Sequence, residues 1–341
     1  MTVAKSSKLI AVVTTIQTPT AALVALSERL RELGADMVVA GDRKGPAGFE
    51  LEGTRFLSLQ DQLDGPFDLA RRSPVGHYTR KNIAYLEAIT GGAGVIYETD
   101  DDNAPLASWT SRTEETGALA VEEIGWVNAY RCFSSELIWP RGFPLDAIAL
   151  SHRREPRLAA STTQARSPIQ QGLANGSPDV DAIWRLVLDR PFDFNVGTSA
   201  RLPAGAWCPF NSQSTWWWPV AFPLLYLPSR CSFRMTDIWR SFVAQRCLWE
   251  LDCGLVFHAA EVLQERNDHD LIRDFNDEVP GYQCNRELVR VLEAVTLARG
   301  ESSVGDNLSR CYEALVAAGF FDATELELVA SWRAGLEQAR A

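Results

Sequence analysis

The stretch Val95-Ile96-Tyr97-Glu98-Thr99-Asp100-Asp101-Asp102-Asn103 decides how the rest of this chain is interpreted. An apolar run typical of a buried strand ends here in three consecutive aspartates and an asparagine. Clustered carboxylates repel one another, and at least one is driven to protonate unless a cation neutralises the group. Carboxylate oxygens suit Mg²⁺ or Mn²⁺. The stretch therefore predicts a metal and diphosphate site at a strand end; the alternative is a solvated turn that caps the following segment.

A helix expected just before this strand supplies cations. Residues 77–89 repeat apolar side chains at helical spacing, which places Arg80, Lys81 and Asn82 in the first turn. Cationic side chains and the free N–H groups of a helix N-terminus both favour a bound phosphate.

Composition limits the class of protein. With 341 residues, 46% of them hydrophobic, the chain can bury a large core in one domain or two. The net charge of -11 argues against nonspecific binding of nucleic acid. The seven cysteines form no CxxC pair, so we expect reduced cysteines and a cytoplasmic protein. The apolar segment 216–228 is too short to span a bilayer and contains three prolines, so we expect no membrane span.

The first third of the chain alternates strand-like and helix-like segments, which is typical of an α/β fold with a parallel sheet. Residues 9–16 read as a buried strand, 19–33 as a helix and 36–42 as a second strand. Ligands of such sheets bind at the carboxyl ends of the strands. The polar residues at these ends are Thr14, Thr15, Asp42 and Asp100 to Asp102. Neither GxGxxG nor GxxxxGK[ST] follows the first strand, so a nucleotide would be held without those phosphate loops.

The order of these features resembles the GT-A glycosyltransferases, which use a DxD motif to hold the metal of a nucleotide-sugar. More narrowly, the chain resembles the STELLO-type glycosyltransferases and their bacterial relatives, and is distantly similar to the reversibly glycosylated polypeptides (UDP-arabinopyranose mutases). Further matching segments are 139–145 (WPRGFPL), 169–183, 208–213 (CPFNSQ), 234–240 (RMTDIWR) and 266–270 (RNDHD). The resemblance extends over residues 8–280.

This resemblance implies a GT-A-like nucleotide-diphospho-sugar transferase fold, a mostly parallel sheet flanked by helices, over residues 1–282. Residues 283–341 show helical patterns alone, and we expect a C-terminal helical region there, whose exposed faces could mediate a homodimer. The segments expected to be helical are 287–295, 308–318 and 323–339.

The resemblance also implies roles for the strand-end residues. Asp100 and Asp102 become candidates for the metal and the ribose, with Asp101 between them, and the metal would be Mn²⁺ or Mg²⁺. The other expected donor-binding residues are Thr14, Thr15 and Asp42 at the nucleoside and Arg80, Lys81 and Asn82 near the diphosphate or base. For Asp42 the alternative is a turn aspartate.

An inverting reaction needs a carboxylate that accepts the proton of the acceptor hydroxyl. Asp237 is the first candidate, because Thr236-Asp237-Ile238-Trp239 opens a helix whose N-terminal turn would face a cleft; the alternative is plain N-capping. Asp179 and Asp181 are the next candidates for a base or a sugar contact. They would equally suit capping of the helix that begins near Asp181.

Two histidines and one tryptophan run remain to be assigned. GT-A enzymes often use a late histidine as a metal ligand, and His269 and His258 are the candidates. His258 follows an apolar run, so a hydrogen-bonded core position is its alternative. Residues 216–218, three tryptophans, would suit either a sugar-stacking platform or the core.

Three functions follow from these patterns. The first is a metal-dependent glycosyltransferase that uses a nucleotide-sugar, with a UDP-sugar as the expected donor, and a glycan or glycoconjugate acceptor. The second is a nucleotide-sugar mutase or self-glycosylating protein. The third is a noncatalytic sugar-nucleotide-binding partner.

Overall fold

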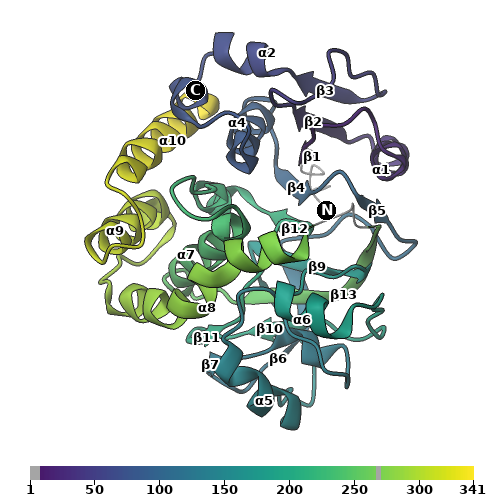
Figure 1. The fold of residues 1–341 in the computed structure, drawn as a ribbon, viewed down its shortest axis with the longest axis vertical. Helices are drawn as coiled ribbons and strands as arrows, with labels where there is room; N and C mark the ends of the chain where they lie inside the picture. Colours follow the sequence, from purple (N-terminus) through teal and green to yellow (C-terminus); the bar gives the residue numbers. More distant parts are fainter. Residues whose placement is uncertain (1–7, 266–269) are drawn as a thin grey trace, which may run out of the picture.

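The computed structural model describes residues 8–265 and 270–341, which fold around one large sheet with helices on both faces (Figure 1). Within these residues the sheet has the strand order β3-β2-β1-β4-β12-β9-β13-β10-β6-β8, and β5 pairs with β13. The strands of this sheet are β1 (Leu9–Thr14), β2 (Asp36–Ala40), β3 (Thr54–Leu57), β4 (Val95–Thr99), β5 (Asn103–Pro105), β6 (Glu115–Ala120), β8 (Thr163–Arg166), β9 (Ile169–Gly176), β10 (Ala200–Leu202), β12 (Ser214–Trp217) and β13 (Leu255–Gln264). Strands β7 (Gly125–Trp126) and β11 (Ala206–Trp207) form a separate pair.

The helices connect these strands and then continue alone at the C-terminal end. The α-helices are α1 (Ala21–Glu32), α2 (Leu59–Asp64), α3 (Asp68–Arg72), α4 (Lys81–Thr90), α5 (Leu145–Arg153), α6 (Ala182–Leu188), α7 (Thr236–Trp249), α8 (Leu271–Ala294), α9 (Val304–Ala317) and α10 (Thr324–Arg340). Short 3₁₀ segments are η1 (Tyr78–Arg80), η2 (Ala129–Cys132), η3 (Pro219–Leu225), η4 (Phe233–Met235) and η5 (Glu301–Ser303). All the strands and helices predicted in the first third are present, with ends shifted by a few residues.

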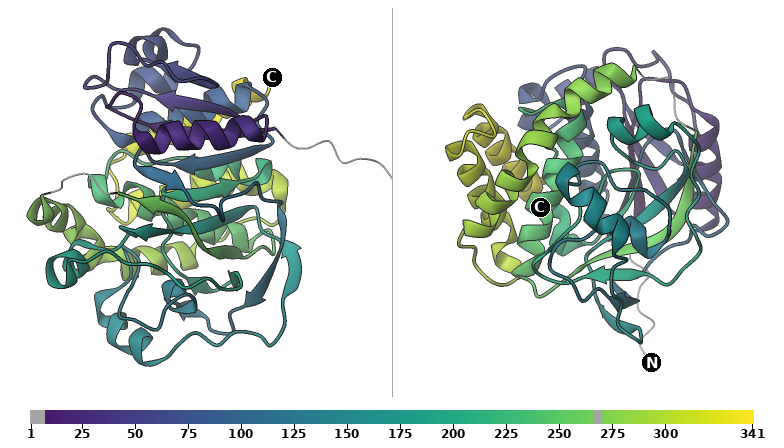
Figure 2. Two further views of the ribbon diagram at one scale, coloured as in Figure 1. Left: turned by 90° about the vertical axis from the view of Figure 1, so that its right-hand side faces the viewer. Right: turned by 60° about the horizontal axis from the view of Figure 1, so that its bottom comes forward.

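Strand β1 is apolar throughout because both of its faces are covered. Ile10 and Val12 pack into the core that contains α4, whereas Ala11 and Val13 pack into the core that contains α1. Figure 2 shows α1 on one side of the sheet and the C-terminal helices on the other. A continuous apolar run is what a strand buried on both faces requires.

The predicted α/β fold is confirmed, and the N-terminal part of the sheet, from β3 to β4, is wholly parallel. Strands β3, β2, β1 and β4 are parallel neighbours, whereas β12 runs antiparallel to both β4 and β9. Beyond β12 the sheet is mixed: β9–β13 and β10–β6 are parallel pairs, whereas β10–β13 and β6–β8 are antiparallel. The β4–β12 pairing places Ser214 opposite Thr99 and so brings the loop before β12 to the acidic triplet.

The helical region predicted at the C-terminal end is observed as α8, α9 and α10. Helix α10 packs on α3 and α4, and α9 packs on α7 and η3, so these helices cover the helices of the sheet. The predicted boundary between residues 282 and 283 falls inside α8, and this division stays a prediction. None of the helices in the described ranges is both long and apolar enough to cross a bilayer.

Candidate functional site

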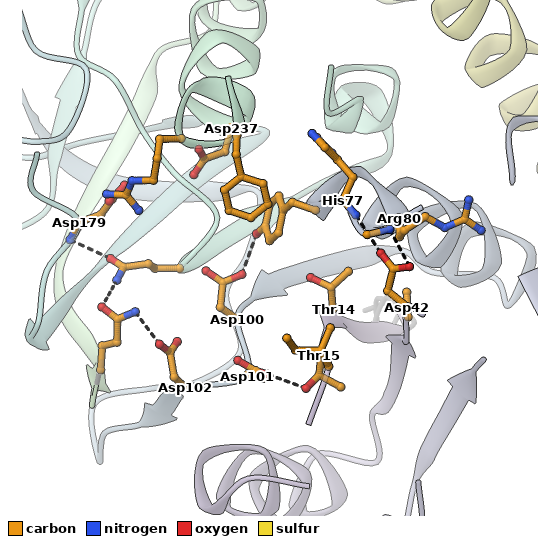
Figure 3. Close-up of a pocket in the computed structure, with 18 of the residues that line it drawn as sticks. Thr14, Thr15, Asp42, His77, Arg80, Asp100, Asp101, Asp102, Asp179 and Asp237 are labelled. Carbon is orange, nitrogen blue, oxygen red and sulfur yellow. Dashed lines mark hydrogen bonds between the residues drawn. The ribbon is translucent and has the colours of Figure 1, made fainter. Parts of the chain in front are cut away.

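A cavity of about 540 Å³ opens where β1, β2 and β4 end (Figure 3). One wall, which we call the strand wall, consists of strand-end residues, namely Thr14, Thr15, Ala40, Asp42 and Asp100 to Asp102. The other, which we call the arginine wall, includes Arg141, Asp179, Gln213, Arg234, Asp237 and Gln264. The prediction that the polar strand ends meet at one cavity is confirmed, and the structure adds Asp179 and Asp237 across from them.

The three aspartates of the triplet point to different partners. Asp100 accepts hydrogen bonds on one carboxylate oxygen from the Tyr78 hydroxyl at 2.7 Å and the Lys81 ammonium at 2.9 Å. The Lys81 side chain is completely buried, whereas that of Asp100 is 28% exposed. Lys81 therefore neutralises Asp100 from beneath the cavity instead of contacting a ligand directly.

The second aspartate is tied to the strand wall. Asp101 accepts a hydrogen bond from the Thr15 hydroxyl at 2.5 Å, and the Thr20 hydroxyl donates to its backbone carbonyl. Thr20 is also the N-cap of α1, so the triplet is fixed to the start of that helix. These bonds explain how three aspartates can follow one another: Asp101 turns toward Thr15 and away from Asp100.

A chain of amides runs from the third aspartate to the opposite wall. The Gln264 amide donates to Asp102 at 2.9 Å, and the Gln213 amide donates to the Gln264 carbonyl oxygen at 2.7 Å. The backbone N–H of Asp179 in turn donates to the Gln213 carbonyl oxygen at 3.1 Å. Because each amide is fixed at both ends, Gln264 can present only its NH₂ group to Asp102.

Burial makes Asp101 and Asp102 weaker acids than usual. It raises the pKa of Asp102 to about 7, with the charges of Asp100 and Asp101 adding to the effect. Burial also raises the pKa of Asp101, although the Thr15 hydroxyl opposes this. A cation in the cavity would relieve this unfavourable negative charge.

The opposite wall is built on one arginine that bridges two carboxylates. Arg141 donates to both oxygens of Asp179, at 2.7 and 2.8 Å, and to both oxygens of Asp237, at 3.0 and 2.9 Å. Burial opposes ionisation of Asp237, but the charge and hydrogen bonds of Arg141, with the charges of Arg240 and Arg234, together lower the pKa of Asp237. The neighbouring residue Gly142 lets this segment pack closely on α7. Its φ is 86°, which favours glycine, and a Cβ there would lie 2.4 Å from the Ile238 side chain.

Asp42 closes a turn at the end of β2. Its carboxylate accepts from the backbone N–H groups of Arg43 at 2.6 Å, Gly76 at 2.9 Å and His77 at 2.9 Å. These three bonds confirm that Asp42 is a turn aspartate. Asp42 also lines the cavity. A contact to the nucleoside stays a prediction for this residue.

Arg80 lines the cavity, but its guanidinium points away from the triplet (Figure 3). It donates to the Gln62 side chain at 2.8 Å and the Ala70 carbonyl at 2.6 Å. Arg80 therefore anchors the segment before α4, whereas the neighbouring cavity residues Arg43 and Lys44, which the sequence did not single out, are exposed cations.

The structure corrects the expected placement of two side chains, those of Asn82 and Asp181. The Asn82 amide pairs with the backbone of Leu227 at 2.9 Å in both directions. Asp181 is fully buried as the N-cap of α6, and it accepts from Trp184 N–H and the Trp139 indole. These two side chains do not line the cavity, because their oxygens are already used to join segments of the fold.

His258 is likewise a core residue. It is 3% exposed and its two ring nitrogens bond Ser199 at 2.6 Å and Gln170 at 2.9 Å, while burial holds its pKa well below the usual value. His269 lies outside the described residues. The stacking interpretation of residues 216–218 is also wrong, because all three tryptophans are buried.

A divalent ion fits this site only in one way. In the described part of the chain, no three carboxylate, histidine or cysteine side chains converge on one point. Lys81 and Thr15 already engage Asp100 and Asp101, which leaves Asp102 and the second oxygen of Asp100. Mg²⁺ is commonly held by one or two carboxylates together with substrate phosphates and water, and this donor set suits it.

The fold and the position of the site define the class. Parallel strands whose carboxyl ends carry an acidic triplet over a cavity, with helices on both faces of the sheet, are consistent with a GT-A-like fold. Comparison with known proteins narrows the class: residues 234–340 match the family model of the STELLO glycosyltransferases. That match includes Asp237, Gln264 and the C-terminal helices, but not the acidic triplet.

Two relatives in Arabidopsis thaliana extend the similarity. The chain is 30% identical to "Probable glycosyltransferase STELLO2" over 238 residues, which is 64% of this chain and 31% of that protein. It is also 30% identical to "Probable glycosyltransferase STELLO1" over 249 residues, which is 66% of this chain and 32% of that protein. The chain thus spans about a third of the length of these relatives. The predicted resemblance to the STELLO-type glycosyltransferases is confirmed.

Proposed function

We propose that this protein is a metal-dependent glycosyltransferase that moves a sugar from a nucleotide-sugar to a glycan or glycoconjugate, with a UDP-sugar as the first donor to test. The observation that carries the proposal is the cavity itself, in which three strand ends with an acidic triplet face two further carboxylates. The similarity to STELLO glycosyltransferases supports the same reaction class.

The strand wall would bind the donor. We expect Thr14, Thr15 and the turn at Asp42 to lie against the nucleoside, and Arg43 and Lys44 to lie near the phosphates. Asp102 and the free oxygen of Asp100 would hold Mn²⁺ or Mg²⁺. When bound, such an ion neutralises charge on a departing diphosphate.

The arginine wall would bind the sugar and the acceptor. Asp237 and Asp179 line the cavity and keep lone pairs for sugar hydroxyls, because each oxygen accepts only one bond from Arg141. As a general base Asp237 would be weak, since Arg141 lowers its pKa. Asp237 and Asp179 stay the candidates for this role, and Asp181, which lies outside the cavity, does not.

The decisive experiment is calorimetric titration of the protein with UDP, GDP, CDP and CMP, each with and without Mn²⁺. We expect one nucleotide to bind only with the metal, and Asp102→Ala to abolish that binding. Asp64→Ala, an exposed carboxylate on α2 outside the cavity, is the matched control and should bind as the wild type does.

The alternatives predict different results in the same titration. Equal binding by the wild type and Asp102→Ala would remove the metal site from the proposal, and no binding of any nucleotide would overturn it. A mutase would interconvert its nucleotide-sugar without an acceptor, which product analysis of a donor-only incubation detects. A cytoplasmic location and a homodimer stay predictions.

A further inference from the structure

Phe233 stands out because of where it is exposed. The chain has 15 Phe, 11 Trp and 7 Tyr, all within the described ranges. Among them only Phe233 is largely exposed, with 52% of its surface accessible to solvent. It lines the cavity. Single exposed apolar side chains are common on protein surfaces, so exposure alone has no meaning. Its position at the cavity requires an explanation, because burying a phenylalanine fully would stabilise the fold by about 1.5–3 kcal/mol.

The ring is held in place from behind. Its centroid lies 5.8 Å from that of His77 and 6.1 Å from that of Tyr78, and both pairs are edge-to-face. His77 is bound through its backbone to Asp42, and Tyr78 through its hydroxyl to Asp100. The platform is therefore attached to the strand wall and cannot turn away without breaking these contacts.

The segment that carries the ring is anchored on both sides. The Ser232 hydroxyl donates to the Asp277 carbonyl of α8, and Arg234 donates to the buried Glu278 at 2.9 Å. Such anchoring reduces the conformational entropy that a ligand must remove on binding. A fixed aromatic ring at a cavity is a feature of small-molecule sites, where apolar surface is combined with a few placed polar groups.

The polar groups beside the ring determine the class of ligand. Arg234 and Asp237 come from the same chain segment and line the same cavity, and Asp237 is ion-paired to Arg141. A pyranose ring has an apolar face of C–H groups and a rim of hydroxyls, so it needs both an aromatic face and charged hydrogen-bonding groups. A nucleobase would instead be expected on the strand wall at Thr14 and Asp42, where ligands of parallel sheets bind.

We propose that Phe233 is the stacking platform for a pyranose ring at this cavity, with Arg234 and Asp237 as partners of its hydroxyls. The inference rests on the proposed function for the origin of the ring, which is the donor sugar or the terminal sugar of the acceptor. It replaces the three buried tryptophans as the aromatic sugar contact.

Saturation-transfer NMR tests the proposal directly. The probes are UDP, a panel of UDP-hexoses, and methyl pyranosides of glucose, galactose, mannose, xylose and arabinose, each with the diamagnetic ion Mg²⁺. The variants are Phe233→Ala, Phe233→Trp and the control Leu150→Ala, an exposed apolar residue outside the cavity. We expect Phe233→Ala to reduce transfer to pyranose C–H protons at least threefold, with Phe233→Trp and Leu150→Ala close to the wild type and the uridine signals unchanged in all.

The arms separate the sources of the ring. Loss of transfer to the hexose of a UDP-hexose assigns the platform to the donor, and loss for a methyl pyranoside assigns it to the acceptor. The proposal is overturned if uridine signals fall as much as pyranose signals, or if no pyranose gives transfer that depends on Phe233. A wild-type protein that binds pyranosides through Phe233 but no nucleotide would overturn the proposed function and leave this site standing.

Discussion

The two walls of the cavity shift carboxylate pKa values in opposite directions. On the strand wall, three consecutive aspartates face one buried lysine, and burial raises the pKa of both Asp101 and Asp102. On the other wall, Arg141 meets all four oxygens of Asp179 and Asp237, and the pKa of Asp237 is lowered. On the strand wall only Asp100 of the triplet is paired with a cation, whereas both carboxylates of the arginine wall are balanced by pairing with Arg141.

This difference indicates a division of labour. A wall with excess negative charge can bind a cation that arrives with its ligand, because the ion removes an existing repulsion. A balanced wall has no such need and can keep a rigid shape that recognises hydroxyl groups. Under the proposed function we therefore expect metal and diphosphate at the strand wall, and sugar recognition at the arginine wall.

The largest expected effect is loss of the balance on the arginine wall. Arg141→Leu leaves Asp179 and Asp237 buried without their cation, and removing one partner of a buried ion pair destabilises a protein by about 3–5 kcal/mol. Urea denaturation at pH 7 measures this loss. Arg157→Leu, whose guanidinium is exposed beside Glu123, is the control and should change stability by no more than about 0.5 kcal/mol.

A second variant checks the cause of that loss. Adding Asp237→Asn to Arg141→Leu removes one of the unpaired charges and should restore part of the stability. If Arg141→Leu were as stable as the wild type, or if the second change lowered stability further, the arginine wall would not be a balanced charge cluster.

The next effect concerns the strand wall and is a loss of binding. Asp102→Asn should weaken nucleotide binding in Mn²⁺ by about 100-fold or more, since metal-mediated charge stabilisation is worth several kcal/mol. Asp101→Asn keeps an oxygen to accept from Thr15 and should lose less than about tenfold. Calorimetry with and without the metal gives both numbers. Equal losses in the two variants would show that the triplet acts as diffuse charge and that Asp102 has no special role.

A smaller effect is expected from the amide chain that joins the two walls. Gln264→Met removes the donor that orients Asp102, and loss of an outer partner of a metal ligand typically reduces metal affinity about 10–100-fold. Titration of Mn²⁺ followed by electron paramagnetic resonance measures free metal directly. The control is Gln164→Met, an exposed glutamine on β8. Unchanged affinity in Gln264→Met would mean that Asp102 needs no orientation from the opposite wall.

The strand wall was predictable from the sequence because its features are local. The apolar run of β4 and the triplet that follows it are contiguous, and parallel strands bring their carboxyl ends together by geometry. A turn at Asp42 was one of its two predicted interpretations, but the bonding partners Gly76 and His77 could not be predicted, because they come from another connection.

The arginine wall was much less predictable because its pieces are far apart in the chain. Arg141 lies in segment 139–145, which resembles the STELLO-type enzymes, but the residues around it in the sequence do not show that it bridges Asp179 and Asp237. Asn82 was a candidate because it lies in the first turn of an expected helix, and His258 because GT-A enzymes often use a late histidine as a metal ligand. The structure shows that each instead satisfies buried hydrogen-bonding groups, which sequence patterns do not reveal.

The last expected effect is a pH dependence whose sign differs between the walls. Without metal, the native state holds the Asp102 proton up to about pH 7, whereas the unfolded chain releases it near about pH 4. Between these values the native state binds more protons, so stability falls as pH rises, by at most about 1.4 kcal/mol per pH unit for one proton. Asp181, whose pKa burial also raises to about 7, contributes to the same decline.

For Asp237 the sign is reversed, because its pKa is lowered in the native state. Its contribution is present above the unfolded pKa of about 4 and is lost as pH falls through the native value. Denaturation in EDTA from pH 4 to 8 should therefore show a flatter profile for Asp102→Asn than for the wild type. Asp237→Asn should keep the decline but be less stable throughout. Mn²⁺ should flatten the wild-type profile and leave that of Asp102→Asn unchanged, since the ion competes with the proton only where Asp102 is present. An identical slope in the wild type and Asp102→Asn would contradict the inference that Asp102 on the strand wall carries the raised pKa.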